Sequence, residues 1–137
     1  MPLLATLALF ATALCLGGMV FFTIAVAPVT HRALPREMAG QFLRTLFPIY
    51  YLFIFATAAG AAVALIPLSG TAAGIMTAVA ALAIWSRQVM TPRINTLGEL
   101  RAAGDADAAR RFGRLHRVSV FANILMMAAS IAVLGGF

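Results

Sequence analysis

Residues 3–27 read LLATLALFATALCLGGMVFFTIAVA, an apolar run without one charged side chain. A helix needs about 20 apolar residues to cross the hydrocarbon core of a bilayer, so this run is long enough to span it. Residues 46–68, 72–90 and 118–137 form three similar runs. Strands are not expected, because the apolar residues continue without the alternation of a half-buried strand. We therefore predict an all-α fold, an integral membrane four-helix bundle formed by residues 1–137 as a single domain.

The composition indicates that lipid is the solvent for much of the surface. Hydrophobic residues make up 63% of the chain and charged residues only 10%, whereas soluble domains carry about 25% charged residues. The net charge of +6 arises from ten arginines, with no lysine. A basic balance can indicate nucleic-acid binding, but no soluble segment remains to carry it. We expect the lipid bilayer as partner and no nucleic acid.

The arginines predict the orientation of the chain in the membrane. Three of them lie between the first and second spans, six lie in residues 93–117, and Arg87 lies just inside the end of the third span. The link at residues 67–71 and the first few residues have no charge. Because arginine-rich loops stay in the cytoplasm, we expect both basic segments there and both termini outside it. The predicted location is the bacterial inner (cytoplasmic) membrane.

Local signals predict where the helices begin and end. Helices two and four are expected to extend into the cytoplasm. Pro35 suits the first turn of helix two, which should reach about Ile66 with a kink near Pro48. The last helix should run from Ala106 to about Leu134, after Gly104 ends the preceding segment and Asp105 provides the N-cap.

The first and third spans carry similar signals. We expect the first helix to end at Pro28, Thr71 to cap the third, and Pro92 to kink or break it. Phe42–Arg44 and Phe112–Arg114 each precede the next span, which suggests two helical hairpins in the same orientation.

Small residues recur at four-residue spacing in helices two and three. They are Ala56, Gly60 and Ala64 in the former, and Gly70, Gly74 and Ala78 in the latter. Such spacing lets membrane helices approach closely. We expect these faces to pack inside the bundle, with a homodimer contact as the alternative.

Polar side chains near the membrane are candidates for function, because they are costly in lipid. His116, Ser119 and Asn123 follow one another at helical spacing and therefore share a face. The third span ends in a second polar group, and one histidine closes the first span at the same depth. The candidate polar pocket comprises Arg87, Gln88, Thr91, Arg93, Asn95, His116, Ser119, Asn123 and His31.

Two interpretations of this pocket are open. In the functional one, arginine binds an anion and histidine carries a proton. In the structural one, Arg87 extends toward the headgroups, Asn123 bonds a neighbouring backbone and His116 sits in the interface. No acidic residue lies in a span and the two histidines are far apart in sequence, so we predict no metal site and assign no catalytic residue.

Several motifs suggest a family. They are GGMVFF at residues 17–22 with Pro28, Leu34–Pro35, LFPIYY at 46–51, TPRIN at 91–95, and Phe112 with LHRVS at 115–119 and Asn123. Over nearly its whole length the chain resembles the transmembrane protein 205 family, whose bacterial members mostly carry the description of a domain of unknown function. The resemblance implies a compact four-helix membrane protein. The human member is associated with resistance to platinum drugs, which implies transport or trafficking.

More distantly, the chain resembles copper-resistance membrane proteins and the haem-dependent protoporphyrinogen oxidase of bacteria. Those haem proteins use a histidine within a span as iron ligand, and no histidine lies in mid-span here. The cofactor is therefore left open, with haem as the one candidate that the resemblance offers.

Three functions follow as hypotheses. The favoured one is transport or binding of a small ion or solute, preferably an anion, at a cytoplasm-facing polar pocket. Because four spans barely enclose a pore, transport would require a homo-oligomer. The alternatives are a haem-linked redox enzyme or subunit, and an accessory membrane subunit without activity of its own. We favour a role that is not enzymatic.

Overall fold

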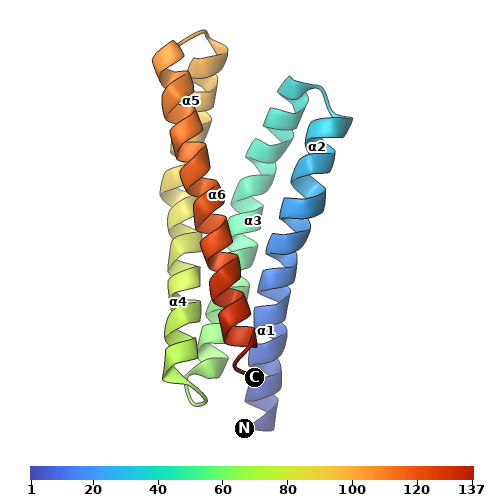
Figure 1. Ribbon diagram of the computed structural model, residues 1–137, viewed down its shortest axis with the longest axis vertical. Helices are drawn as coiled ribbons and strands as arrows, with labels where there is room; N and C mark the ends of the chain where they lie inside the picture. Colours follow the sequence, from blue (N-terminus) through green and yellow to red (C-terminus); the bar gives the residue numbers. More distant parts are fainter.

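The computed structural model describes residues 1–137, and its four long rods are all helical (Figure 1). The first rod comprises α1 (Pro2–Phe21), the π-helix η1 (Phe22–Val26) and α2 (Ala27–Ala33), and the second is α3 (Arg36–Leu65). The third comprises α4 (Gly70–Trp85), the π-helix η2 (Ser86–Met90) and α5 (Thr91–Ala102), and the fourth is α6 (Ala106–Leu134). Each rod is long and apolar enough to cross a membrane. The predicted all-α membrane bundle is confirmed.

The rods alternate in direction and form a ring. Helix α1 packs against α3 and α6, and α4 packs against the same two helices. The diagonal pairs, α1 with α4 and α3 with α6, have no Cα atoms within 8 Å of each other. Both termini lie at one end of the bundle, and the α2–α3 and α5–α6 turns lie at the other (Figure 1).

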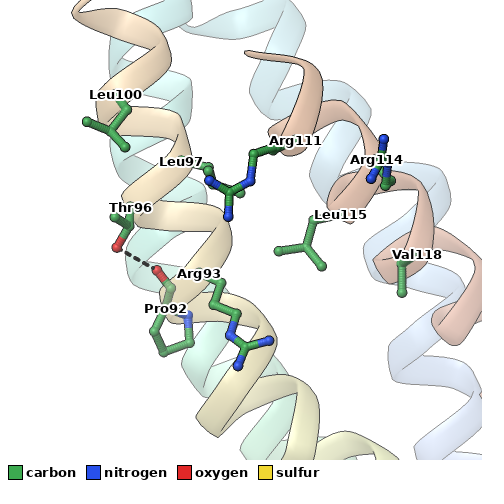
Figure 2. Close-up of a pocket in the computed structure, with 9 residues that line it drawn as sticks. All are labelled: Pro92, Arg93, Thr96, Leu97, Leu100, Arg111, Arg114, Leu115 and Val118. Carbon is green, nitrogen blue, oxygen red and sulfur yellow. Dashed lines mark hydrogen bonds between the residues drawn. The ribbon is translucent and has the colours of Figure 1, made fainter. Parts of the chain in front are cut away.

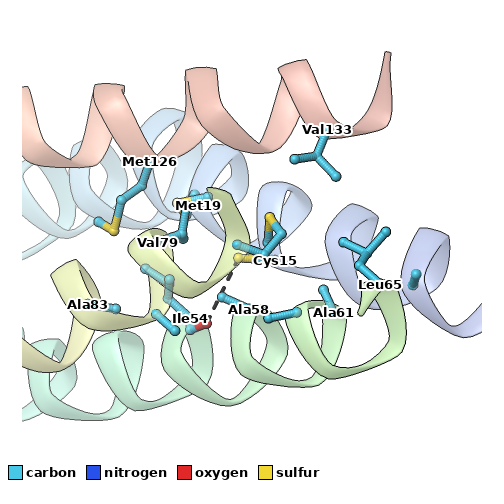
Figure 3. Packing of buried hydrophobic residues seen from close by; sticks show 14 of the residues in the cluster. Cys15, Met19, Ile54, Ala58, Ala61, Leu65, Val79, Ala83, Met126 and Val133 are labelled. Carbon is cyan, nitrogen blue, oxygen red and sulfur yellow. Dashed lines mark hydrogen bonds between the residues drawn. The ribbon is translucent and has the colours of Figure 1, made fainter. Parts of the chain in front are cut away.

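Charge divides the bundle along its length. Every charged side chain lies in residues 27–49 or 87–117, which we call the arginine end. Residues 1–26, 50–86 and 118–137 form the charge-free half. The main hydrophobic core lies entirely in this half and has no member in α2 or α5. Its side chains come from all four rods and include Cys15, Met19, Ile54, Ala58, Ala61, Val79, Ala83, Met126 and Val133 (Figure 3).

The two π-helices explain how the first and third rods accommodate proline. The Ala27 N–H bonds the Phe22 carbonyl and the Thr91 N–H bonds the Ser86 carbonyl, each five residues back. Each π-helix ends two residues before a proline, Pro28 or Pro92. A proline ring clashes with the carbonyl four residues earlier, and a wider turn moves that carbonyl away. The prediction that the first helix ends at Pro28 is therefore wrong, since the rod continues. Of the predicted kink or break at Pro92, the break is wrong for the same reason.

Other predicted boundaries have mixed outcomes. Helix α6 has the predicted bounds: Gly104 has a φ of +94°, and the Asp105 carboxylate accepts the Ala108 N–H at 3.0 Å. Thr71 is not the cap of α4, because the Ser69 hydroxyl accepts the Ala72 N–H at 3.2 Å. Helix α3 begins just after Pro35, at Arg36, and continues through Pro48. Extension is not limited to helices two and four, since α2 and α5 prolong the other two rods.

The prediction for the small residues is also wrong in part. Ala64 is buried, but Ala56, Gly60, Gly70, Gly74 and Ala78 are exposed. A Cβ added at Gly60, Gly70 or Gly74 would meet nothing within 4 Å. The small residues that pack in the core are instead Ala58, Ala61, Ala62 and Ala64 of α3 with Ala73, Ala80 and Ala83 of α4.

Candidate functional site

Three polar side chains connect separate rods where the charge-free half meets the arginine end. The Tyr50 hydroxyl of α3 donates to Asn123 Oδ1 of α6. Asn123 Nδ2 donates in turn to Thr23 Oγ1 of η1 at 3.1 Å, and Thr23 donates to the Met19 carbonyl at 2.8 Å. Because α3 and α6 lie on a diagonal of the ring, only long side chains can join them. Asn123 thus uses both ends of its amide to hold the rods together.

Aromatic rings surround this connection. The Tyr50 ring stacks on Phe22 with centroids 4.2 Å apart, and Phe47 lies 5.3 Å from Phe22. Tyr51 follows with its ring centroid 5.2 Å from that of Tyr50. Phe47, Tyr50 and Tyr51 of the LFPIYY segment therefore form an aromatic layer against Phe22 of η1.

Arg87 is hydrogen-bonded to a neighbouring helix and lines neither of the two cavities described below. Its Nε donates to the Pro48 carbonyl of α3 at 3.1 Å, and its Nη1 donates to Gln88 Oε1 at 2.9 Å. Arg87 lies in η2, and the contact crosses to the helix where proline interrupts the backbone ladder. Arg87 thus braces the third rod against the second, and Gln88 accepts a hydrogen bond from it within the third rod.

Four of the nine candidate residues line one small cavity. Thr91 and Asn95 of α5 face His116 and Ser119 of α6, and Phe47, Tyr51 and Ile94 complete the lining. The cavity volume is about 30 Å³, which suits one or two water molecules and no larger solute. The Ser119 hydroxyl donates to the His116 carbonyl at 2.7 Å, within its own helix.

His116 is part of a stack at the wall of this cavity. The guanidinium carbon of Arg101 lies 3.9 Å from the centroid of the Phe112 ring, and that ring is parallel to His116 at 6.1 Å. Burial lowers the pKa of His116 below its ordinary value, and the positive charges of His31 and Arg101 lower it further. His116 is therefore neutral at pH 7.

His31 does not join these residues. It lies in the last turn of α2, with an exposed side chain. No three His, Cys, Asp or Glu side chains come together in a way that could hold a metal ion.

Arg93 belongs to a separate and much larger groove between α5 and α6, with a volume of about 560 Å³. Figure 2 shows Arg111 and Leu115 reaching from α6 toward α5, with Arg93 extending from α5 below them. The residues that line this α5–α6 groove are Pro92, Arg93, Thr96, Leu97, Leu100, Arg111, Arg114, Leu115 and Val118. It thus combines three guanidinium groups with an aliphatic wall.

The groove arginines have no carboxylate partners. The two ion pairs of the protein join Arg44 to Glu99 at 2.8 Å and Arg110 to Asp107 at 3.3 Å. Asp105 caps α6. The positive charge of Arg93, Arg111 and Arg114 is therefore available to an anion.

A family model described as "Domain of unknown function (DUF4149)" matches residues 10–103. The chain belongs to this family. The matched residues extend from α1 to the end of α5, so they include Arg93 and the aromatic layer, and the α6 wall of the groove lies beyond them. No curated protein matches the chain, and no solved structure does.

In this DUF4149 protein, the sequence did not indicate which polar residues meet. Tyr50, the partner of Asn123, was not among the candidates, although a hydroxyl within an apolar run is a signal of the same kind. Arg111 and Arg114 were grouped with the other basic residues of their segment. Their spacing with Leu115 and Val118 on one helix face is the signal that identifies the groove.

Proposed function

We propose that the protein is a membrane-embedded binding protein that holds an anionic solute in the α5–α6 groove. The observation that carries this proposal is the presence of Arg93, Arg111 and Arg114 around one cavity without a carboxylate partner. Planar guanidinium groups bind carboxylates and phosphates through paired, charge-assisted hydrogen bonds. The groove therefore fits a phosphate or carboxylate that carries an apolar portion.

Binding is favoured over conduction by the interior of the bundle. The core side chains fill the charge-free half, and the cavity beside His116 has room only for water. Movement of a solute across the membrane would require the rods to separate or several protomers to surround a path. Anion transport thus remains a secondary form of the same proposal, with a homo-oligomer as its requirement.

The proposal includes the orientation in the membrane that the sequence predicts. The arginine end faces the cytoplasm, both termini lie outside it, and the membrane is a bacterial inner membrane. The distribution of arginine supports this orientation, since all ten lie at one end of the bundle. The anion would then come from the cytoplasm or from the inner leaflet.

A more specific family assignment is also part of the proposal. We propose that the chain is related to the transmembrane protein 205 family, and the motifs that suggest this support it by their positions. LFPIYY and LHRVS with Asn123 lie far apart in the sequence, yet their residues Tyr50 and Asn123 are bonded. The more distant likeness to haem proteins receives no such support, because His31 and His116 lie outside the predicted spans.

Titration with a soluble organic phosphate tests the proposed function. Glycerol 3-phosphate is added to the purified full-length protein in neutral detergent, and binding is measured as a shift of the unfolding temperature. Arg93→Gln or Arg111→Gln should lower the affinity about tenfold, as expected for the loss of one charge-assisted contact.

Arg36→Gln is the matched control, because it removes one charge from the arginine end outside the groove. Its affinity should stay within about twofold of that of the unmodified protein. An equal loss in all three variants, or no saturable binding at all, would contradict an anion site in this groove.

A further inference from the structure

We infer that the natural occupant of the α5–α6 groove is an anionic phospholipid of the adjoining leaflet, bound by its phosphate. This inference rests on the proposed function and identifies the class of its ligand. Four observations carry it: the depth of the groove, its division into cationic and aliphatic parts, its sideways opening, and the pairing of the arginines around it.

The depth of the groove matches the headgroup layer. Pro92 follows the third apolar run, which ends at residue 90, and Val118 begins the fourth. Both residues line the groove, so its lower part lies where the hydrocarbon ends. Basic pockets between membrane helices at this level are typical sites for anionic headgroups.

The lining has a cationic part and an aliphatic part, which match the phosphate and the acyl chains of a phospholipid. Arg93, Arg111 and Arg114 supply donors for a phosphate, whereas Leu97, Leu115 and Val118 supply an aliphatic wall. A small inorganic anion would leave that wall without a partner, and an acyl chain would cover it. In Figure 2, Leu115 points into the space between the helices and Val118 lies below it, toward the membrane-spanning part of α6.

The groove opens to the outside of the bundle and not toward its axis. Val118 and Leu100 are each 44% exposed. The residues of α6 that line the groove occupy one face of the helix, and His116, Ser119 and Asn123 occupy another that is directed at α3, α5 and η1. A lipid can therefore enter from the side without any movement of the rods.

The groove arginines differ from several neighbouring arginines in having no partner within the protein. Arg44 and Arg110 each have a carboxylate within 3.3 Å, and Arg101 lies over the Phe112 ring. The groove arginines have neither kind of partner. In a membrane, a phosphate diester from the lipid layer is the anion that is always present at this depth.

Lipid selectivity of the purified protein tests the inference. The full chain is reconstituted in nanodiscs of equal parts phosphatidylglycerol and phosphatidylcholine, extracted in mild detergent, and the retained lipids are counted by native mass spectrometry. We expect phosphatidylglycerol to be retained in preference to phosphatidylcholine. The double variant Arg93→Gln/Arg111→Gln should reduce that preference about tenfold, whereas Arg111→Lys should keep part of it because the charge remains.

A second double variant separates a groove from general attraction by charge. Arg32→Gln/Arg36→Gln removes the same charge from the α2–α3 end and should retain the lipid preference. If both double variants lose the lipid preference equally, the lipid inference is overturned. If phosphatidylglycerol is never preferred while glycerol 3-phosphate still binds through Arg93 and Arg111, the lipid inference is overturned and the proposed function stands. If neither the lipid nor the soluble phosphate binds, both are overturned.

Discussion

The charge-free half and the arginine end are built from the same four rods, yet they differ in how those rods meet. In the charge-free half, small and flexible side chains from all four rods form one continuous core (Figure 3). At the arginine end, α2 and α5 contribute nothing to that core, and water-sized and solute-sized cavities lie between helices. The comparison teaches that the packed core and the cavities are separated along the length of the bundle.

The boundary between the two regions has structural features of its own. The π-helices η1 (Phe22–Val26) and η2 (Ser86–Met90) lie at this boundary, and the Tyr50–Asn123–Thr23 connection joins three rods on its charge-free side. A π-helix changes the rotation of the residues that follow. The side chains of α2 and α5 therefore continue on different faces from those of α1 and α4, which lets the arginine end diverge from the core.

The largest effect is expected from filling the core of the charge-free half. Ala58 of α3 is fully buried in the main hydrophobic core. Ala58→Leu adds three carbon atoms where no space exists, so it should destabilise the fold by about 3 kcal/mol. Unfolding of the detergent-solubilised protein by sodium dodecyl sulfate, followed by circular dichroism, measures the change.

Ala56→Leu is the matched control for this variant. Ala56 lies two residues earlier on the same helix, with an exposed side chain, and the variant should alter stability by no more than about 0.5 kcal/mol. A loss as large as that of Ala58→Leu would mean that the outer face of α3 is covered by another chain, and the division between core and lipid face would need revision.

These two alanines show why the sequence predicts the extent of each rod better than it predicts which face of the rod points into the bundle. Lengths of apolar runs identify four spans, and the Gly104–Asp105 signal identifies the start of α6, because both depend on local chemistry alone. Four-residue spacing places Ala56 and Gly60 on one face, but it does not say which neighbour, if any, that face meets. The direction of each face depends on the positions of the other three rods.

The candidate site illustrates the same limit. Helical spacing correctly groups His116 with Ser119, which line one cavity. It does not reveal that Asn123 is bonded to Tyr50, because that bond joins residues 73 positions apart. Nor does composition reveal which arginines lack a carboxylate partner, since Arg44 finds Glu99 from a different hairpin.

An intermediate effect is expected at the boundary between the two regions. Tyr50→Phe and Asn123→Leu each remove the hydrogen bond between α3 and α6, and a double-mutant cycle should give a coupling of about 1 kcal/mol, as found for polar pairs between membrane helices. The same unfolding experiment measures it. Ser119→Ala is the control, because its hydroxyl bonds only within its own helix. Additive losses for Tyr50 and Asn123 would show that packing alone holds α3 and α6 together at this level.

The smallest effect is expected at the arginine end, where His116 titrates. Its pKa is lowered by burial and by the charges of His31 and Arg101, so the folded protein binds a proton there less readily than the unfolded chain. Stability should therefore decrease as the pH falls below the ordinary range of histidine, because protonation then favours the unfolded chain. Since the His116 side chain is only partly buried, solvent screening limits the change in unfolding temperature to about 1–2 °C.

Unfolding temperatures of the native protein and of His116→Gln between pH 7.5 and 5 measure this contribution. The variant has no proton to gain at that position, so its unfolding temperature should change less with pH. His31→Gln should act in the same direction by removing one of the charges that oppose protonation of His116. If His116→Gln leaves the pH dependence unchanged, His116 titrates alike in the folded and unfolded chain. The stack with Phe112 and Arg101 would then be as open to water as the groove beside it, and the arginine end would contribute nothing to stability through this residue.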